Sequence, residues 1–143
     1  MPGLGPKLGP RLLAEIGSDR SRFENAAALQ CYAGTAPVTI QSGQMTKHVM
    51  RHACHDGLRH AVHLWADLSR QRCAWAQAYY QAHRETDQSH SCALRCLGQR
   101  WLKILWSMWQ TGDTYDAERH ACNQQKHGSW VLKLTPASPS QTA

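Results

Sequence analysis

The sequence contains no long hydrophobic run. No apolar stretch approaches the roughly 20 residues that a helix needs to cross a bilayer, which argues against a membrane-spanning helix. No hydrophobic signal segment precedes the six cysteines, and several of them stand where a helix would bury them as small apolar side chains. We therefore expect a soluble, cytoplasmic protein whose thiols are reduced and not joined in a disulfide framework.

Clustered acids are also missing. Two-metal phosphodiester chemistry needs several carboxylates in one place, and the acids here, such as Glu15, Asp56 and Glu85, are scattered along the chain. The sequence has no internal repeat either. These absences exclude a self-contained two-metal nuclease and a repeat architecture.

Four possible zinc ligands nevertheless fall within eight residues, namely His48, His52, Cys54 and His55. Two of the histidines could share one helical face, and the cysteine could supply a thiolate. Structural zinc sites usually draw on two separated ligand pairs, however, and no second Cys/His pair stands at finger spacing, so His60 or His63 would be needed. We predict no metal in this chain and a basic surface here, with a zinc-stabilised DNA-binding module as the alternative.

Positive charge is what the sequence has in excess. Lys and Arg outnumber Asp and Glu by 16 to 10, and the isoelectric point is near 9.2. The excess is uneven, because residues 43–84 hold six Lys or Arg against only Asp56 and Asp67. This pattern predicts a polyanionic partner such as nucleic acid.

The first residues, PGLGPK, lead into a short helix expected at residues 11–16. Gly3 and Gly5 allow a tight turn with exposed amide N–H groups, and the following helix adds its positive end near Lys7. Such a turn is typical of a helix-hairpin-helix element, which holds a DNA phosphate without reading sequence. Since the first helix is missing, we expect a truncated element at residues 1–17; a plain Gly/Pro-rich tail is the alternative.

The Ser42-Gly43 pair is the candidate site of chemistry. Lys47, Arg51 and Arg59 follow it closely in the sequence. A serine hydroxyl is a poor nucleophile unless it is activated, so surrounding positive charge must take part in any attack on a phosphodiester. Ser-Gly alone is a common turn pair. In this basic setting, we interpret Ser42 as a candidate nucleophile and the three cations as phosphate contacts.

Apolar periodicity predicts a mainly α fold. Amphipathic helices are expected at residues 26–33, 58–69, 72–84 and 91–111, capped by Asn25, Asp56 and Ser89 where a cap is evident. Residues 35–46 are loop or strand, and residues 47–53 fit strand or helix, which allows one short β-hairpin. From residue 113 to residue 143 there is little periodicity, and a loose tail is predicted.

Two helix faces are expected to form most of the core. The face of the helix at residues 72–84 consists of Ala74, Trp75, Ala78, Tyr79 and Ala82. The face of the longest helix consists of Ala93, Cys96, Leu97, Trp101, Ile104, Leu105 and Met108.

Four segments together resemble the C-terminal domain of insertion-sequence 110/116/902 family transposases, relatives of the Piv-type DNA invertases. The segments are PGLGPKLGPRLLAEIGSDRSRF, ENAAALQCYAGTAPVTIQSG, RHACHDGLRHAVHLWA and WAQAYYQAHRETDQSHSCALRCLGQRWLKILWSMWQTGDTYD. The likeness extends from about residue 2 to residue 120 and rests on PGxGP, YAGTAPVTxxSG and a later LRxAxxxW helix in that order. It implies that residues 1–112 form that domain.

The resemblance implies chemistry shared with another domain. Members of the family pair this domain with an N-terminal RuvC-like domain whose Asp/Glu/Asp/Asp set binds magnesium, and a serine of the C-terminal domain is thought to join covalently to DNA. A structured bridge RNA guides the choice of target and donor. By motif, the serine corresponds to Ser42, the hairpin glycines to Gly3 and Gly5, and the basic residues to Lys47 and Arg51. The implied partners are DNA, a structured guide RNA, and further copies of the chain or the full-length transposase.

The chain departs from the family pattern in two ways. The acidic domain is absent, and His55-Asp56-Gly57 stands where many relatives have a Lys-x-Gly signature. We therefore expect a truncated copy that holds no cofactor itself and is inactive alone, with magnesium belonging to the missing domain. Two functions stay open: the strand-transfer half of a transposase, or a non-catalytic helix-hairpin-helix nucleic-acid-binding domain.

Overall fold

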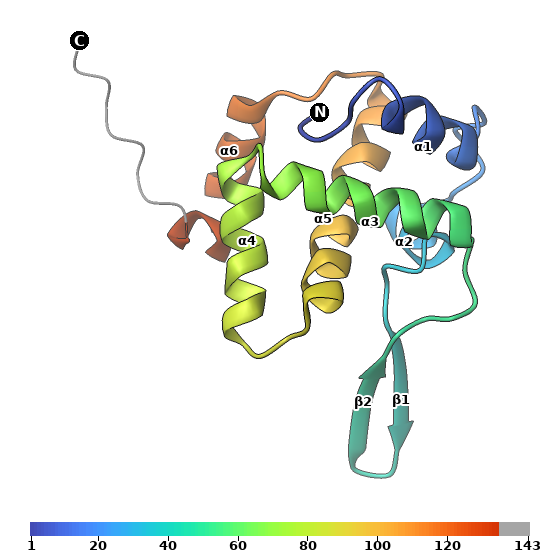
Figure 1. The fold of residues 1–143 in the computed structure, drawn as a ribbon, viewed down its shortest axis with the longest axis vertical. Helices are drawn as coiled ribbons and strands as arrows, with labels where there is room; N and C mark the ends of the chain where they lie inside the picture. Colours follow the sequence, from blue (N-terminus) through green and yellow to red (C-terminus); the bar gives the residue numbers. More distant parts are fainter. Residues whose placement is uncertain (135–143) are drawn as a thin grey trace.

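A computed structural model describes residues 1–134, which form a helical body from which a two-stranded hairpin projects (Figure 1). The elements in chain order are α1 (Leu8–Ile16), α2 (Ala26–Tyr32), β1 (Val38–Ser42), β2 (Met45–Val49), α3 (Asp56–Arg70), α4 (Ala74–Glu85), α5 (His90–Thr111), α6 (Ala117–Lys126) and the 3-10 helix η1 (Trp130–Lys133). The predicted mainly α fold with one short hairpin is confirmed. Within the described residues, no helix combines the length and apolar character needed to cross a membrane.

Short polar side chains and glycines set the helix ends where the sequence predicts them. The Asn25 side chain accepts a hydrogen bond from the Ala28 amide at 2.9 Å, and Ser89 caps α5 in the same way. Gly34 and Gly112 follow α2 and α5 with φ of 70° and 75°, in the left-handed region that favours glycine. The predicted caps and stops of these two helices are confirmed.

The start of α3 differs from the prediction. Asp56 is the first helical residue, and the cap is His55, whose Nδ1 accepts a hydrogen bond from the Leu58 amide at 3.1 Å. The His55 ring also stacks on Tyr32, with centroids 5.2 Å apart, and its Nε2 lies 3.5 Å from Glu15 Oε2. One imidazole therefore connects α1, α2 and α3. A local sequence pattern favours the carboxylate as cap because it does not include these tertiary contacts.

The core lies where α5 packs against α2, α3 and α4. Trp65 and Trp101 are its largest fully buried side chains, with ring centroids 5.3 Å apart. The Trp101 indole N–H donates to the Ser69 hydroxyl at 2.7 Å, so these two buried polar groups satisfy each other. A Cβ on Gly98 would lie 2.7 Å from Val62 Cγ1; the glycine therefore lets α5 approach α3 closely.

Two predicted core faces are partly wrong. In α5, Ile104, Leu105 and Met108 are only half-buried; the buried residues are Ala93, Leu94, Leu97, Gly98, Trp101 and Leu102. In α4, Ala74 is exposed, and the buried residues are Ala76, Tyr79 and Tyr80. The first half of α5 has neighbours on several sides, so its buried surface is wider than one stripe, and α4 turns its inner face toward both α3 and α5.

The predicted loose tail contains helical structure. The Asp116 side chain caps α6 by accepting two backbone N–H groups, at 2.9 and 3.2 Å. In η1, the Trp130 ring lies 5.4 Å from the Tyr79 ring of α4. Helix α6 has no buried residue, and for this reason apolar periodicity does not reveal it. Residues 135–143 of the predicted tail lie outside the described residues.

Candidate nucleic-acid interface

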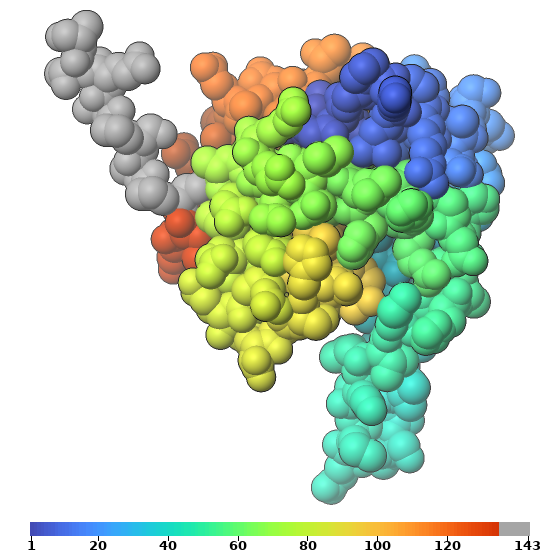
Figure 2. All heavy atoms as spheres, viewed as in Figure 1, coloured from blue at the N-terminus to red at the C-terminus, as the bar shows by residue number. Residues whose placement is uncertain are grey.

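The hairpin, residues 38–49, stands away from the helical body and is called the arm below (Figure 1 and Figure 2). Its strands are antiparallel, with Val38 opposite Val49 and Ser42 opposite Met45. Gly43 occupies the turn with φ of 58°. Neither strand packs against a helix of the described chain, so the arm is attached to the body only at its base.

One face of the arm carries both a hydroxyl and an ammonium group. Directly opposite residues of an antiparallel pair share a face, so Ser42 and Met45 lie on the same side as Ile40 and Lys47. Ser42 and Lys47 are exposed, and the Ser42 hydroxyl has no hydrogen-bond partner among residues 1–134. The two lie two residue pairs apart along the arm, a spacing of about 7 Å. The opposite face carries Thr39, Gln41, Thr46 and His48.

The other two predicted phosphate contacts belong to the base of the arm and to the body. Arg51 is half-buried, and its Nε donates to the Ala36 carbonyl at 3.3 Å. Arg59 lies in the first turn of α3 with Nη2 2.8 Å from Asp56 Oδ1, and its Nη1 is buried without a hydrogen-bond partner in the described chain. The structure therefore brings Lys47 onto the serine's face but keeps Arg51 and Arg59 away from the tip.

The N-terminal turn does not lie beside the arm. In Figure 1, α1 and the N-terminus lie at the opposite end of the molecule from the hairpin tip. Gly3 is buried with φ of 79°, and a Cβ there would lie 2.6 Å from the Ser69 amide nitrogen at the end of α3. Gly3 thus has a packing role that the sequence prediction does not anticipate, whereas Gly5 and Lys7 are exposed as a phosphate contact requires.

The structure does not bring the four possible zinc ligands together. His48 lies in β2, not on a helix, and its Nδ1 is 3.0 Å from the Thr39 hydroxyl. His55 is engaged as the α3 cap. No group of three His, Cys, Asp or Glu residues converges as a metal site anywhere in the described chain.

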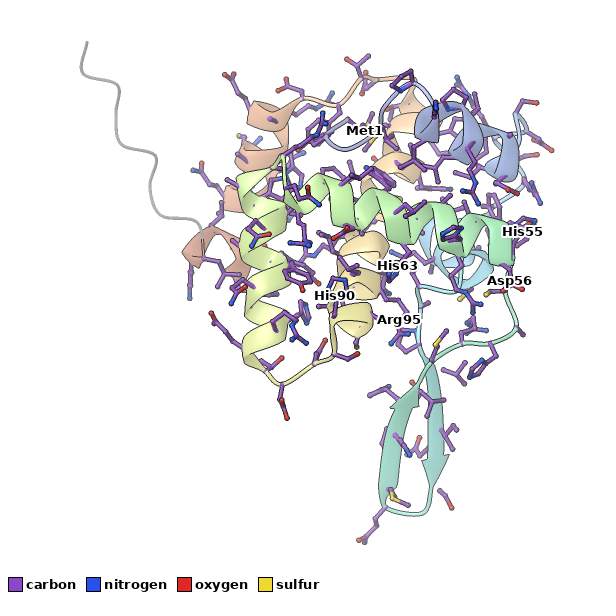
Figure 3. All side chains as sticks on the ribbon, in the orientation of Figure 1. Met1, His55, Asp56, His63, His90 and Arg95 are labelled. Carbon is purple, nitrogen blue, oxygen red and sulfur yellow. The ribbon has the colours of Figure 1, made fainter. Side chains whose placement is uncertain are left out.

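The fold brings together a further set of basic side chains, here called the histidine–arginine patch, consisting of His60 and His63 of α3 and His90 and Arg95 of α5. In the view of Figure 3, His63, His90 and Arg95 lie between α4 and the base of the arm. Burial lowers the pKa of His63, and the neighbouring His90, His60 and Arg95 lower it further, against an opposing effect of Asp67. Sequence reasoning missed His90 and Arg95 because only packing of α5 on α3 places them there.

A helical body with basic surfaces and an arm that carries an exposed serine is suited to bind a polyanion. The profile of the Transposase IS116/IS110/IS902 family matches residues 1–81, more than half of the chain. The chain belongs to this family, as its sequence motifs predict.

Three curated relatives are similar to this chain. The "Mini-circle putative transposase for IS117" of Streptomyces coelicolor is 45% identical over 120 residues, which cover 82% of this chain and 28% of that protein. The "Insertion element IS900 uncharacterized 42 kDa protein" of Mycobacterium paratuberculosis is 35% identical over 109 residues, 76% of this chain and 27% of that protein. The "Insertion element IS110 uncharacterized 43.6 kDa protein" of S. coelicolor is 32% identical over 124 residues, which cover 85% of this chain and 30% of that protein. The chain thus spans less than a third of the length of these relatives.

Proposed function

We propose that this chain is the DNA-binding and strand-transfer part of an insertion-sequence transposase, with Ser42 as the nucleophile. The observation that carries the proposal is the position of Ser42, which is exposed near the tip of an arm that packs against no described helix. It shares its face with Lys47, and its hydroxyl has no hydrogen bond to any described residue. Membership of the transposase family supports the same activity, DNA transposition.

The proposed step is a transesterification at phosphorus. The Ser42 oxygen forms a bond to the phosphorus of a DNA phosphodiester while the bond to one sugar oxygen breaks, and that oxygen leaves with a proton. Negative charge grows on the non-bridging oxygens as the bond forms, and the Lys47 ammonium on the same face can stabilise it. The positive φ of Gly43 turns the chain directly after Ser42, which leaves the hydroxyl open to a long substrate.

The arm itself supplies no base for the serine proton. The only imidazole on the arm, His48, lies on the opposite face and is hydrogen-bonded to Thr39. We therefore assign the base and the magnesium-binding acids to a second domain or subunit, as the family resemblance implies. Magnesium bound there would neutralise charge on the reacting phosphate. This division agrees with the scattered acids of the chain.

The partners in this proposal are nucleic acids and other transposase chains. DNA is the substrate, and a structured guide RNA would select the sites that are joined. A full-length transposase would bring the acids to Ser42, and further copies of this chain would assemble with it. Because the relatives come from bacteria, this reaction belongs in the cytoplasm, where the chromosome lies.

A second candidate is a non-catalytic nucleic-acid-binding domain. This candidate is favoured because the exposed cations lie at two ends of the molecule. Lys7, before α1, and Lys47, on the arm, could each contact phosphates without any chemistry. Both candidates bind DNA. Only the first forms a covalent bond to it.

The test is a denaturing gel of end-labelled, nicked DNA incubated with the protein, magnesium and a family member's acidic domain supplied in trans. Wild type should give a labelled protein–DNA adduct. Ser42→Ala should give none while binding DNA almost as well, because one neutral hydroxyl contributes little to phosphate affinity. Thr46→Ala is the matched control, since it removes an exposed hydroxyl from the other face of the same arm.

The outcomes separate the two candidates. Loss of the adduct in Ser42→Ala alone supports strand transfer by Ser42. An adduct that persists in Ser42→Ala places the nucleophile elsewhere. DNA binding without an adduct in any protein supports the non-catalytic domain.

A further inference from the structure

The histidine–arginine patch joins two helices that are separate in the chain. His60 and His63 lie one turn apart on α3, and His90 and Arg95 lie in the first two turns of α5, which packs against α3. His60 and His90 are exposed, whereas His63 and Arg95 are half-buried. The Arg95 side chain has no hydrogen bond or ion pair with any described residue. A half-buried guanidinium without such a partner, beside imidazoles that repel it once they are protonated, would be stabilised by a bound anion.

The acid that acts on His63 is Asp67, and this carboxylate is already paired. Asp67 of α3 lies 2.7 Å from Arg70 Nη2 on the same helix. From α1, Arg11 adds a further cation, with Nη2 3.4 Å from His60 Nδ1. From α4, the neutral Tyr80 faces His90. The charges that face His63 are therefore mostly positive, and burial together with these neighbours lowers its pKa.

Tyr80 fixes the orientation of His90. The phenol oxygen lies 2.7 Å from His90 Nδ1, and the Arg70 guanidinium lies 4.7 Å from the centroid of the Tyr80 ring. A cation over the ring strengthens the phenol as a donor, so we assign the proton of this bond to Tyr80. The neutral imidazole then accepts at Nδ1 and carries its single N–H proton on Nε2. His90 can thus donate to an anion even when it is uncharged.

We propose that the histidine–arginine patch binds the phosphate backbone of nucleic acid as a second contact surface, beside the arm, in a way that strengthens as pH falls. The inference rests on the proposed function, because it assumes the same substrate as the arm. In the view of Figure 3 the patch and the arm follow one another across the molecule, so one strand of phosphates could contact both. A bound phosphate favours the protonated form of His63, so binding takes up a proton as the pH falls toward the ordinary histidine pKa of about 6.5.

The test is binding of the whole chain to a short DNA duplex, measured by fluorescence anisotropy at pH 8 and pH 6 and over a range of salt. Wild type should bind several-fold more tightly at pH 6. Arg95→Gln should weaken binding at both pH values and reduce the log–log salt slope by about one. The double variant His63→Gln with His90→Gln should lose most of the gain at pH 6. Far-UV circular dichroism and a thermal melt check that each variant is folded.

His127→Gln is the matched control, because His127 is exposed at the end of α6, outside the patch. It should bind as wild type does. Equal loss in His127→Gln and in the patch variants would mean that binding follows net charge, which overturns the proposal. Wild-type affinity in Arg95→Gln and in the double variant would also overturn it.

Two further comparisons identify the ligand and separate this inference from the proposed function. The same titrations with an RNA duplex show which backbone the patch prefers, and a patch-dependent affinity for either one supports a phosphate site. If the patch variants lose binding and wild type forms no serine adduct, the patch is supported and strand transfer by Ser42 is contradicted. If the patch variants bind with wild-type affinity and form the adduct, strand transfer by Ser42 is supported and the patch is contradicted.

Discussion

The helical body and the arm are stabilised in different ways. In the body, Leu97 and Trp101 are fully buried, and α5 contacts three other helices. On the arm, Ile40 and Met45 are 51% and 69% exposed, and the two strands contact only each other among the described elements. A hairpin of two strands is marginally stable by itself. Stability therefore resides in the body and the proposed chemistry in the arm, so each should tolerate changes in the other.

The largest effect is expected from the centre of the body. Leu97→Ala removes a fully buried side chain and leaves a cavity, which should lower the free energy of unfolding by about 2–5 kcal/mol. Urea unfolding followed by circular dichroism measures it. Leu64→Ala on α3, at 39% exposure, serves as the control and should cost much less. If Leu97→Ala unfolds like wild type, α5 is not the centre of the body.

A smaller loss should come from the buried hydrogen bond between Trp101 and Ser69. Ser69→Ala leaves the indole N–H without its partner at 2.7 Å, and an unsatisfied buried donor costs about 1–3 kcal/mol. Ser107→Ala, an exposed serine on α5, is the control and should change little. The same urea experiment compares them. Equal stability of the two variants would show that the indole finds another acceptor.

The body should also be the acid-sensitive part. Burial lowers the pKa of His83 and of His120, and Arg100 lowers both further. The unfolded chain binds protons near the ordinary histidine pKa of about 6.5, above the folded values, so stability should fall as pH drops through that value. Unfolding at pH 7.5 and pH 5.5 measures the change. His83→Gln should reduce the pH dependence, and a wild-type dependence in that variant would contradict the assignment.

The smallest effect is expected on the arm. Met45→Ala removes a side chain that is 69% exposed and should change the free energy of unfolding by less than about 0.5 kcal/mol. The measurement is urea unfolding at two protein concentrations. A loss above 1 kcal/mol would mean that the apolar face of the arm is covered in solution. A concentration dependence of that loss would identify the cover as a second copy of the chain.

Local sequence signals were sufficient for much of the fold. Asn25, Ser89 and Gly112 mark helix ends because a cap or a left-handed turn depends on one residue and its nearest neighbours. The exposed position of Ser42 also follows from local chemistry, since a Gly43 turn between two short strands must lie at a tip.

Features that depend on tertiary contacts were not predictable. His55 caps α3 in place of Asp56 while also contacting Tyr32 and Glu15, and Gly3 is buried because the N-terminal turn packs on the end of α3. The histidine–arginine patch exists only because α5 lies against α3. Helix α6 was not predicted because it has no buried face that would produce a periodic apolar pattern.

The alternation of side chains along the arm limits the distances from the body at which the Ser42 hydroxyl can reach a substrate. One residue added to each strand would move the tip by about 3.4 Å but turn the serine to the opposite side of the hairpin. Two residues added to each strand would restore its side and extend the reach by about 7 Å. The reach of the hydroxyl from the body can therefore change only in steps of that size. A substrate phosphate at an intermediate distance has to be brought to Ser42 by bending of the nucleic acid.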